Sequence, residues 1–419
     1  MNLTSWLLYL EGLPSGSRTT HLVAVRYVAE ELGLFDETPI ITVAGTNGKG
    51  STVIFLESML RAHGFSVGGY ISPHLLSYNE RIRLNGRDID DASLCLALTM
   101  VRRAAGEYVL SYFEFTTLAA LLFFKWQKPD YLILEVGLGG RFDAVNIFDP
   151  LLAIITTISL DHTQILGETR GQIGLEKAHI MKPGGLAIVG PAMPDTVYSL
   201  AETINVQLYV LGEDFGYHPS SDNKEWSDWY FRETQFRNLP SSHLPMDSAA
   251  LAIMATRLLL GANGISEENI RRGISEASLL GRMQEVVFRH RKIILDVAHN
   301  AEATGLLSTK LRANKKQGKL IALFNALSDK DIGSMVANLA GLVDHWYLGE
   351  LKTERRSAID LVAEEITKQD SSAQITLCSS ISLALDQAIA ESEEIDTIVA
   401  FGSFYVVAEA LEIILMSIR

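Results

Sequence analysis

The amino-acid sequence predicts an α/β protein of two domains, each built on a parallel sheet. Apolar, β-branched runs alternate with helical patterns along most of the chain, the order typical of parallel strands joined by crossover helices. The chain has 419 residues, more than the roughly 250–300 residues that one hydrophobic core usually supports. The alternation begins again after Gly281-Arg282, so we place the domains at 1–281 and 282–419.

In the first domain, the expected elements follow this alternation. Strands are predicted at Ile40–Ala44, Tyr131–Val136, Ala153–Thr157 and Leu186–Val189. Helices are predicted at Val53–His63, Asp91–Ala105, Thr116–Trp126, Ile173–Met181 and Asp247–Leu260. Between the last two helices, Asp214–Asn238 interleaves Tyr, Trp and Phe with polar residues, which predicts an antiparallel hairpin.

The second domain is expected to be a smaller, Rossmann-like α/β domain. Its predicted strands are Lys292–Asp296, Leu320–Phe324, His345–Leu348, Gln374–Leu377 and Thr397–Phe401. Helical stretches separate these strands, and a helix over Tyr405–Ile418 closes the chain. Strands that alternate with helices in this way indicate a parallel sheet.

Composition narrows the class of protein. Apolar residues make up 47% and charged residues 21%, an ordinary globular mixture. The net charge of −14 disfavours nonspecific binding to nucleic acid or to an anionic membrane. Cys95 and Cys378 lie far apart in no metal-like spacing, which fits a reducing compartment. Met1–Leu10 lacks a basic signal-peptide start and Leu118–Phe124 is too short to span a bilayer, so we expect a cytoplasmic protein.

The strand Ile40–Ala44 leads into a glycine-rich turn, Gly45-Thr46-Asn47-Gly48-Lys49-Gly50-Ser51-Thr52, and then into a helix. Glycines let backbone N–H groups approach phosphate oxygens, and the helix N-terminus adds its dipole. Lys49 would neutralise the terminal phosphates and Ser51 would hold Mg²⁺. Gly50 departs from the usual G-x-x-x-x-G-K-[ST] spacing, and a tight connection without a ligand is the alternative. The arrangement predicts an N-terminal domain like that of P-loop nucleoside triphosphatases.

Polar side chains follow two other predicted strands of the first domain. Glu135 ends an apolar strand and precedes a glycine cluster, and His162 follows the next strand. Ligands of open α/β sheets bind beyond the carboxyl ends of strands, so these residues could converge with Ser51 on one metal ion. The alternatives are a solvated acid and a structural histidine, since histidine is unusual for Mg²⁺. Lys177 has only the features of a helix-surface lysine beside Glu176.

The first strand of the second domain also ends in a polar cluster, Asp296-Val297-Ala298-His299-Asn300. Asp, His and Asn together at a strand end indicate a polar site at a domain edge. Arg282 precedes this strand and could reach phosphates. Capping of the following helix is a credible structural role for Asn300.

Together these motifs resemble the folylpolyglutamate synthase/dihydrofolate synthase family of the ATP-dependent Mur ligase superfamily. The matching segments, in the family's order, are 42–52, 70–75, 79–82, 112–117, 134–146, 159–163, 176–178, 281–282, 296–300, 328–331 and 401–403. Ser72-Pro73-His74-Leu75 and Phe113–Thr117 look like the bifunctional bacterial enzymes. Several of these motifs are weak alone, and jointly they are highly specific.

The resemblance assigns roles to individual residues. It implies Lys49, Lys177 and His299 as catalytic residues, with Lys177 carbamylated. It implies Ser51, Glu135 and His162 as metal ligands. It implies nucleotide contacts by Asn47, Gly48, Lys49, Gly50, Ser51, Thr52, Ser248, Arg282, Asp296 and His299. It implies contacts with the pterin-bearing substrate by Ser72, Pro73, His74, Phe113, Glu114, Phe142, Asp143 and Ala144.

The sequence departs from the family pattern at three positions. Ser248 stands where the family commonly has Asn, a nucleotide contact, which puts nucleotide affinity or selectivity in question. Ala301 replaces a frequent Pro, and Asn325 stands where Gly is common. None of the three removes a phosphate, metal or lysine position, so we expect activity to survive.

The resemblance implies an ATP-dependent amide ligase. It would add L-glutamate to 7,8-dihydropteroate and further glutamates to tetrahydrofolate through an acyl phosphate. ATP and Mg²⁺ are the implied cofactors, with room for a monovalent cation, and the expected state is a monomer with small-molecule partners only. One alternative is a Mur-type ligase for UDP-muropeptides, which shares the phosphate loop but not the Ser-Pro-His-Leu and Phe-Glu-Phe-Thr-Thr segments. Another is a noncatalytic nucleotide-binding regulator, which Ser248 and Asn325 keep open. The retained Lys49, Glu135, His162 and Lys177 argue against it, since a binding module has no need of a carbamylated lysine and a full metal set.

Overall fold

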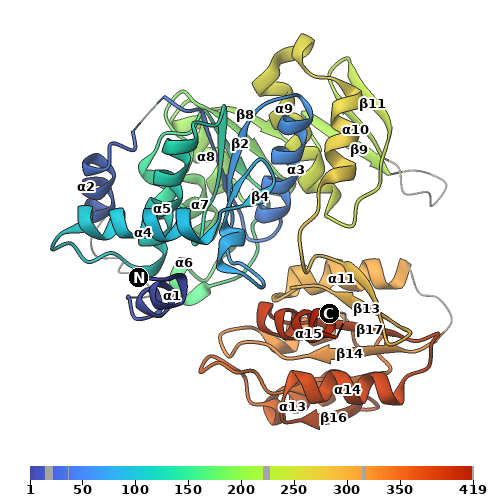
Figure 1. Cartoon of the computed structure of the whole chain (residues 1–419). Helices are drawn as coiled ribbons and strands as arrows, with labels where there is room; N and C mark the ends of the chain where they lie inside the picture. Colours follow the sequence, from blue (N-terminus) through green and yellow to red (C-terminus); the bar gives the residue numbers. More distant parts are fainter. Residues whose placement is uncertain (15–21, 36, 220–226, 314–317, 418–419) are drawn as a thin grey trace. The chain divides into compact units, whose positions relative to one another are not determined.

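A computed structural model of the chain describes residues 1–14, 22–35, 37–219, 227–313 and 318–417. The chain divides into two compact units, Met1–Ser278 and Leu279–Arg419 (Figure 1). This division and the boundary expected after Gly281 both fall between α10 (Glu267–Glu276) and β12 (Gln284–Phe288). In the part of the chain that is described, no helix is long and apolar enough to cross a membrane.

The first unit contains a mixed sheet with the order β4-β3-β2-β5-β1-β6-β7-β8. Its strands are β1 (Ile40–Ala44), β2 (Val67–Tyr70), β3 (Ile82–Leu84), β4 (Arg87–Asp88), β5 (Tyr131–Glu135), β6 (Leu152–Ile155), β7 (Leu186–Val189) and β8 (Gln207–Val210). The six strands from β2 to β8 in this order are parallel, and β3 and β4 add an antiparallel edge. The α/β class predicted from the sequence is confirmed.

Helices cover both faces of this sheet. They are α1 (Leu3–Glu11), α2 (Val23–Glu31), α3 (Lys49–Ala62), α4 (Asp91–Ala105), α5 (Tyr112–Gln127), α6 (Thr163–Leu166), α7 (Arg170–Ala178), α8 (Asp195–Thr203), α9 (Met246–Gly264) and α10, with 3₁₀ turns η1 (Tyr78–Arg81) and η2 (Ala144–Ile147). Helix α3 packs on α9 and α10, whereas α1, α2, α4 and α5 pack together. Figure 1 shows these two groups on opposite sides of the strands.

Most predicted elements of the first unit are present with limits shifted by a few residues, and two of the differences have an evident form. The segment predicted as a hairpin forms three antiparallel strands, β9 (Phe215–Pro219), β10 (Ser227–Phe231) and β11 (Thr234–Leu239), although residues 220–226 lie outside the described part. Helix α5 begins at Tyr112 rather than Thr116 because Ser111 and Glu114 form a capping box there. Each difference concerns a boundary or a strand count, not the class of the domain.

Strand β2 was missed by the sequence analysis for a physical reason. Its sequence, Val67-Gly68-Gly69-Tyr70, carries two glycines, which are depleted in strands. A Cβ on Gly68 would lie 2.6 Å from Leu132 Cδ2 and 2.8 Å from Phe124 Cδ1. The strand therefore uses glycine to let the sheet and α5 approach closely.

The second unit is a six-stranded sheet with the order β12-β13-β17-β14-β15-β16. Its elements are β12, β13 (Arg291–Leu295), α11 (Ala301–Ala313), β14 (Leu320–Phe324), α12 (Ile332–Ala337), β15 (His345–Gly349), α13 (Ile359–Gln369), β16 (Gln374–Cys378), α14 (Ile381–Glu391), β17 (Thr397–Phe401) and α15 (Phe404–Met416). All neighbouring pairs are parallel except β12 with β13. The predicted Rossmann-like alternation is present, and Ile418 of the predicted last helix lies outside the described residues.

Candidate active site

Strand register brings the predicted site segments of the first unit to one edge of its sheet. Val43 pairs with Glu135, and Ala44 pairs with Ile155. On the other side of β5, Tyr70 pairs with Leu134. The loops that follow β1, β2, β5 and β6 therefore leave the sheet at neighbouring carboxyl ends, where ligands of open α/β sheets bind.

The glycine-rich turn lies between β1 and α3, as predicted. Gly48 is the N-cap of α3 with φ = 82°, a left-handed conformation that favours glycine. Gly45 has φ = 148°, and a Cβ there would lie 1.9 Å from Thr156 Oγ1. The backbone path of the turn thus requires glycine at both positions and places the first N–H groups of α3 at the turn.

Two threonines directly after β6 brace this turn. Thr157 accepts from the turn twice, through its carbonyl from Thr46 N at 2.8 Å and through Oγ1 from Asn47 N at 3.1 Å. The Thr156 hydroxyl donates to Asn47 O at 2.5 Å. The sequence analysis missed both threonines, although two hydroxyl residues at the end of a strand next to the phosphate loop were a usable signal.

The side chains of the turn are partly held by its own backbone. Lys49 Nζ donates to the carbonyls of Gly45 at 3.1 Å and Thr46 at 3.2 Å. The Thr52 hydroxyl donates to Gly48 O at 2.9 Å, and Ser51 beside it is buried. Ser248 Oγ also donates to Gly48 O, at 3.2 Å. Ser248 therefore contacts the phosphate loop directly, although it replaces the common Asn of the family.

Glu135 is a buried carboxylate at the end of β5, with 3% of its surface exposed. Its Oε2 accepts from Ser72 N at 2.9 Å. His162 lies in the left-handed region at φ = 51°, and its backbone N–H donates to Asp161 Oδ1 at 2.8 Å. Within the described residues, no three His, Cys, Asp or Glu side chains form a metal-binding group. The predicted ligands Ser51, Glu135 and His162 include only two such residues, so this set stays a prediction.

Lys177 is not a surface lysine, contrary to its local sequence pattern. It lies in α7 with 5% of its surface exposed. Burial, and to a lesser extent the nearby charge of Lys49, lowers the pKa of its amine to about 7, although Asp161 and Asp143 oppose the shift. The amine is therefore substantially neutral, and so nucleophilic, near neutral pH.

Asp143 organises the loop that follows β5. Its Oδ2 accepts from Gly137 N and Leu138 N, both at 3.0 Å, and its Oδ1 accepts from Val145 N at 3.1 Å. Burial raises the pKa of its carboxyl to about 6, although these three hydrogen bonds oppose the shift. Ala144 next to it is buried in η2.

The predicted substrate residues around this loop differ in their surroundings. The ring of Phe113 lies against Gly137, where a Cβ would meet Phe113 Cζ at 2.6 Å. Phe142 is 45% exposed, with the Arg141 guanidinium 5.2 Å from its ring centroid. The Glu114 carboxylate accepts from Ser111 N at 2.7 Å, so its evident structural role is to cap α5.

The second unit places its own predicted residues around Phe404. Arg282 lies 5.2 Å from the Phe404 ring centroid, and the His299 ring lies 5.9 Å from it. Asp296 accepts from Met283 N at 2.8 Å and from Ala298 N at 2.9 Å. Burial raises the pKa of Asp296, and the charge of Arg282 partly offsets this.

Hydrogen bonds indicate the tautomer of His299 and the structural role of Asn300. His299 Nδ1 lies 3.0 Å from Val297 O, and a carbonyl can only accept, so Nδ1 carries a proton. Asn300 Oδ1 accepts from Ala303 N at 3.0 Å, which gives Asn300 the helix-capping role expected from its position before α11. Asn325, the third departure from the family pattern, is buried and donates to Gly349 O at 2.8 Å.

Both units match known protein families. The Mur ligase middle domain matches residues 43–232, and the Mur ligase glutamate ligase domain matches residues 281–404. The dihydrofolate synthase/folylpolyglutamate synthase of Escherichia coli (strain K12) is 40% identical over 418 residues, which cover 98% of this chain and 95% of the relative.

Solved structures agree over the full length. E. coli FolC in complex with DHPP and ADP superposes with a TM-score of 0.94 at 38% identity and covers 100% of this chain and 99% of its own. A bifunctional folylpolyglutamate synthase/dihydrofolate synthase with Mn, AMPPNP and L-glutamate bound superposes with a TM-score of 0.90 at 39% identity, and covers 99% of this chain and 98% of its own.

Proposed function

The chain belongs to the dihydrofolate synthase/folylpolyglutamate synthase family of Mur ligases, and from this we propose that it is an ATP-dependent glutamate ligase. Its first reaction joins L-glutamate to 7,8-dihydropteroate, and its second adds further glutamates to tetrahydrofolate. One structural observation carries the proposal. The phosphate loop, the Glu135 carboxylate and the loop that starts at Ser72 meet at neighbouring strand ends of one sheet.

The chemistry follows from the weakness of a free carboxylate as an acyl donor. Transfer of the γ-phosphoryl group of ATP to the substrate carboxylate gives an acyl phosphate and ADP. The amine of L-glutamate then attacks the acyl carbon, and phosphate leaves as the amide forms. Phosphoryl transfer depends mainly on positioning and charge neutralisation, which Lys49 and the N–H groups at the start of α3 provide.

The proposed cofactors are ATP with Mg²⁺, and a monovalent cation is compatible with the same site. Ser51, Glu135 and His162 would hold the divalent ion, which supplies charge neutralisation at the phosphates when bound. The buried carboxylate and the hydroxyl are hard oxygen donors, as Mg²⁺ prefers, while the imidazole also suits Mn²⁺. Asn47, Gly48, Gly50, Thr52 and Ser248 are the further nucleotide contacts that we propose in this unit.

We also propose that Lys177 acts as its carbamate. A neutral amine attacks CO₂, an N–C bond forms and a proton leaves, so a neutral side chain becomes an anion. The low pKa of Lys177 makes the neutral amine available near pH 7. The carbamate would place a negative charge near the Lys49 cation, which favours the modified state.

The remaining predicted residues complete this proposal. Arg282, Asp296 and His299 are the proposed nucleotide contacts of the second unit, with His299 as a catalytic residue. Ser72, Pro73, His74, Phe113, Glu114, Phe142, Asp143 and Ala144 are the proposed contacts of the pterin-bearing substrate. Its partners are then small molecules. The two free cysteines support a reducing, cytoplasmic location, and the family resemblance supports a monomer.

An isotope experiment tests the reaction. With ¹⁸O in the carboxylate of dihydropteroate, phosphoryl transfer to that carboxylate places one ¹⁸O in the released phosphate. We expect ¹⁸O-labelled phosphate in equal amount to the dihydrofolate formed. Unlabelled phosphate would contradict the acyl phosphate, and ADP release with a UDP-muropeptide in place of dihydropteroate would favour the Mur-type alternative.

A further inference from the structure

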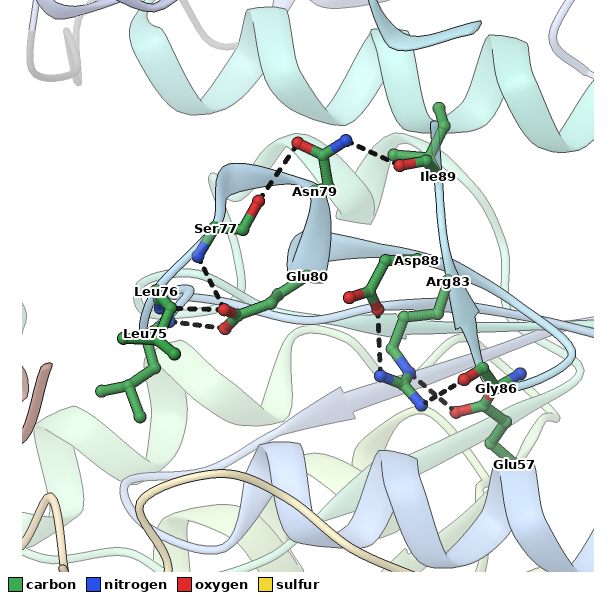
Figure 2. A network of polar contacts seen from close by, with 10 residues as sticks. All are labelled: Glu57, Leu75, Leu76, Ser77, Asn79, Glu80, Arg83, Gly86, Asp88 and Ile89. Atoms are coloured by element: carbon green, nitrogen blue, oxygen red, sulfur yellow. Dashed lines mark hydrogen bonds and ion pairs between the residues drawn. The ribbon is translucent and has the colours of Figure 1, made fainter. Parts of the chain in front are cut away.

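The substrate loop, residues Ser72–Ser77, follows β2 and carries three of the proposed substrate contacts. One carboxylate holds its second half. Glu80 Oε2 accepts from Leu75 N at 2.7 Å, and Glu80 Oε1 accepts from Leu76 N at 2.8 Å and from Ser77 N at 2.7 Å (Figure 2). Hydrogen bonds from three consecutive N–H groups to one carboxylate are charge-assisted, and they hold the backbone of Leu75–Ser77 firmly.

The first half of the substrate loop is held at its other end. Ser72 N donates to Glu135 Oε2, and Ile71 N, just before the loop, donates to Arg81 O at 2.9 Å. Glu80 and Arg81 are consecutive residues of η1. The loop is therefore closed onto η1, and its conformation depends on this short turn.

The turn itself is anchored to the helix that starts at the phosphate loop. Arg83, just beyond η1, donates through Nε to Glu57 Oε2 of α3 at 3.1 Å and forms an ion pair with Asp88 at 3.1 Å (Figure 2). Glu57 is 1% exposed, and its Oε1 accepts from Gly86 N at 2.5 Å. The Arg83–Glu57 ion pair therefore links the strand that follows η1 to helix α3.

Arg81 determines the tautomer of His74. Its Nε donates to His74 Nδ1 at 2.8 Å. Arg81 is itself buried, with its guanidinium 5.3 Å from the Tyr78 ring centroid and 5.4 Å from the Tyr112 ring centroid. Because an arginine Nε–H can only donate, His74 Nδ1 must accept, and the single proton of the neutral ring is on Nε2.

Burial and the Arg81 cation keep the His74 ring neutral. Burial, and to a lesser extent the Arg81 cation, lowers the pKa of His74 to about 4, although the Glu80 carboxylate opposes the shift. Tyr78, whose ring centroid lies 5.6 Å from that of His74, has a pKa well above its ordinary value and stays neutral. Among the described residues His74 makes no hydrogen bond other than that to Arg81, and its half-buried ring leaves Nε2–H for a ligand.

We propose that Glu80 and Arg81 are positioning residues that present His74 to the pterin-bearing substrate as a hydrogen-bond donor only. Glu80 fixes the backbone that carries His74, and Arg81 fixes its tautomer. The substrate atom that meets Nε2–H is then an acceptor, such as a carbonyl oxygen or an unprotonated ring nitrogen. A ligand with a donor at that position is rejected, because two N–H groups would face each other. This proposal rests on the proposed function for the identity of the substrate.

Nitrogen NMR of the full-length protein tests the tautomer without any turnover. We expect the ¹⁵N shifts of His74 to show a protonated Nε2 and an unprotonated Nδ1, unchanged from about pH 5.5 to about pH 8.5. In Arg81→Met, the ring should exchange between tautomers and its pKa should rise toward about 6.5. Arg87→Met, at an exposed arginine of the same hairpin, should leave His74 unchanged. A protonated Nδ1 in the wild type would overturn the proposal.

Steady-state kinetics tests the consequence for binding. Arg81→Met should raise KM for dihydropteroate about tenfold, as expected for one lost hydrogen bond, and leave KM for ATP unchanged. In a His74→Ala background, the same substitution should have almost no further effect. Equal effects in both backgrounds would mean that Arg81 acts only through stability and would overturn the proposal.

Two further variants separate the roles. His74→Gln keeps an N–H donor at the end of the side chain and should lose less affinity for dihydropteroate than His74→Ala. Glu80→Gln loses one of three accepted hydrogen bonds and should raise KM for dihydropteroate but not for ATP. A rise in both KM values would refute the local role of Glu80. A wild type that shows the predicted NMR state but no turnover would count against the proposed function alone.

Discussion

The backbone N–H of Ser72 donates to the Glu135 carboxylate, with 2.9 Å between Ser72 N and Glu135 Oε2. Glu135 is buried at the end of β5, and Ser72 begins the substrate loop after β2. One carboxylate therefore serves two functions in the proposed enzyme. It is a proposed metal ligand, and it fixes the position of the loop that would contact the pterin-bearing substrate.

The two roles of Glu135 can be separated by substitution. Glu135→Gln keeps an oxygen that accepts from Ser72 N but removes the negative charge. Loss of a partner that only orients a metal ligand already costs about 10–100-fold in affinity, so for this proposed ligand we expect metal affinity to fall at least about tenfold, with KM for dihydropteroate nearly unchanged. Titration of Mn²⁺ by electron paramagnetic resonance measures the affinity, and Glu168→Gln, at an exposed glutamate of the same unit, is the control. Unchanged metal affinity would remove Glu135 from the ligand set.

Lys177 should carry a carbamate. Wild-type protein incubated with ¹³C-bicarbonate is expected to show one slowly exchanging carbamate resonance in ¹³C NMR. Lys177→Arg should lack it, because a guanidinium remains protonated and does not attack CO₂. We expect this variant to lose most of the ligase activity. A resonance that persists in Lys177→Arg would assign the modification to another amine.

The pH dependence of stability has a definite sign at Lys177. Its pKa is 10.5 in the unfolded chain and about 7 in the folded protein, so between these values the unfolded state binds more protons. The free energy of unfolding should therefore rise with pH from about 7 to about 10.5. Below pH 7 the buried amine is protonated, and its burial lowers the free energy of unfolding by a few kcal/mol. Lys177→Met in CO₂-free buffer should lack this rise. Denaturant melts of both proteins at several pH values measure the difference, and parallel curves would contradict it.

The phosphate loop should not tolerate a side chain at Gly45. A Cβ there would lie 1.9 Å from Thr156 Oγ1, and the φ of 148° is unfavourable for other residues. Gly45→Ala is expected to weaken ATP binding at least about tenfold by displacing the Thr156 brace. Gly305→Ala is the control, since its Cβ meets nothing closer than 3.7 Å. Calorimetric titration with an ATP analogue compares the two, and equal affinities would contradict the assignment of the loop.

Asp296 should stabilise the second unit. Its two carboxylate oxygens accept from Met283 N and Ala298 N, and an amide nitrogen in Asp296→Asn would face one of these donors. We expect unfolding of this unit to become easier by about 1–3 kcal/mol. Hydrogen exchange of amides in β13 and β17 measures the change in that unit. Unchanged exchange together with lost activity would leave Asp296 with a role at the nucleotide only.

The sequence predicted those elements whose apolar pattern agrees with their packing. Strands β1, β7, β14 and β17 have the predicted limits because each is a β-branched or apolar run bounded by turn residues. Strand β2 was missed because Gly68 and Gly69 serve close packing against neighbours that are distant in sequence. Such contacts depend on the folded arrangement, which local pattern does not contain.

The same limit applies to the candidate site. The phosphate loop and Glu135 were visible because they follow strands directly. The burial of Lys177 was not, because α7 has the composition of a surface helix and the residues that cover this lysine come from other segments. The proposed roles of Glu80 and Arg81 also depend on contacts in the folded chain, since Glu80 accepts from Leu75 N and Arg81 donates to His74.

The most direct test of the central claim is ADP release by the wild-type protein with L-glutamate and MgATP, once with 7,8-dihydropteroate and once with tetrahydrofolate. The proposed function predicts turnover with both substrates, with one more glutamate on each product by mass spectrometry. Turnover with tetrahydrofolate alone would reduce the assignment to a tail-extending ligase. No ADP release with either substrate, under conditions in which the protein is folded and binds ATP, would contradict the account.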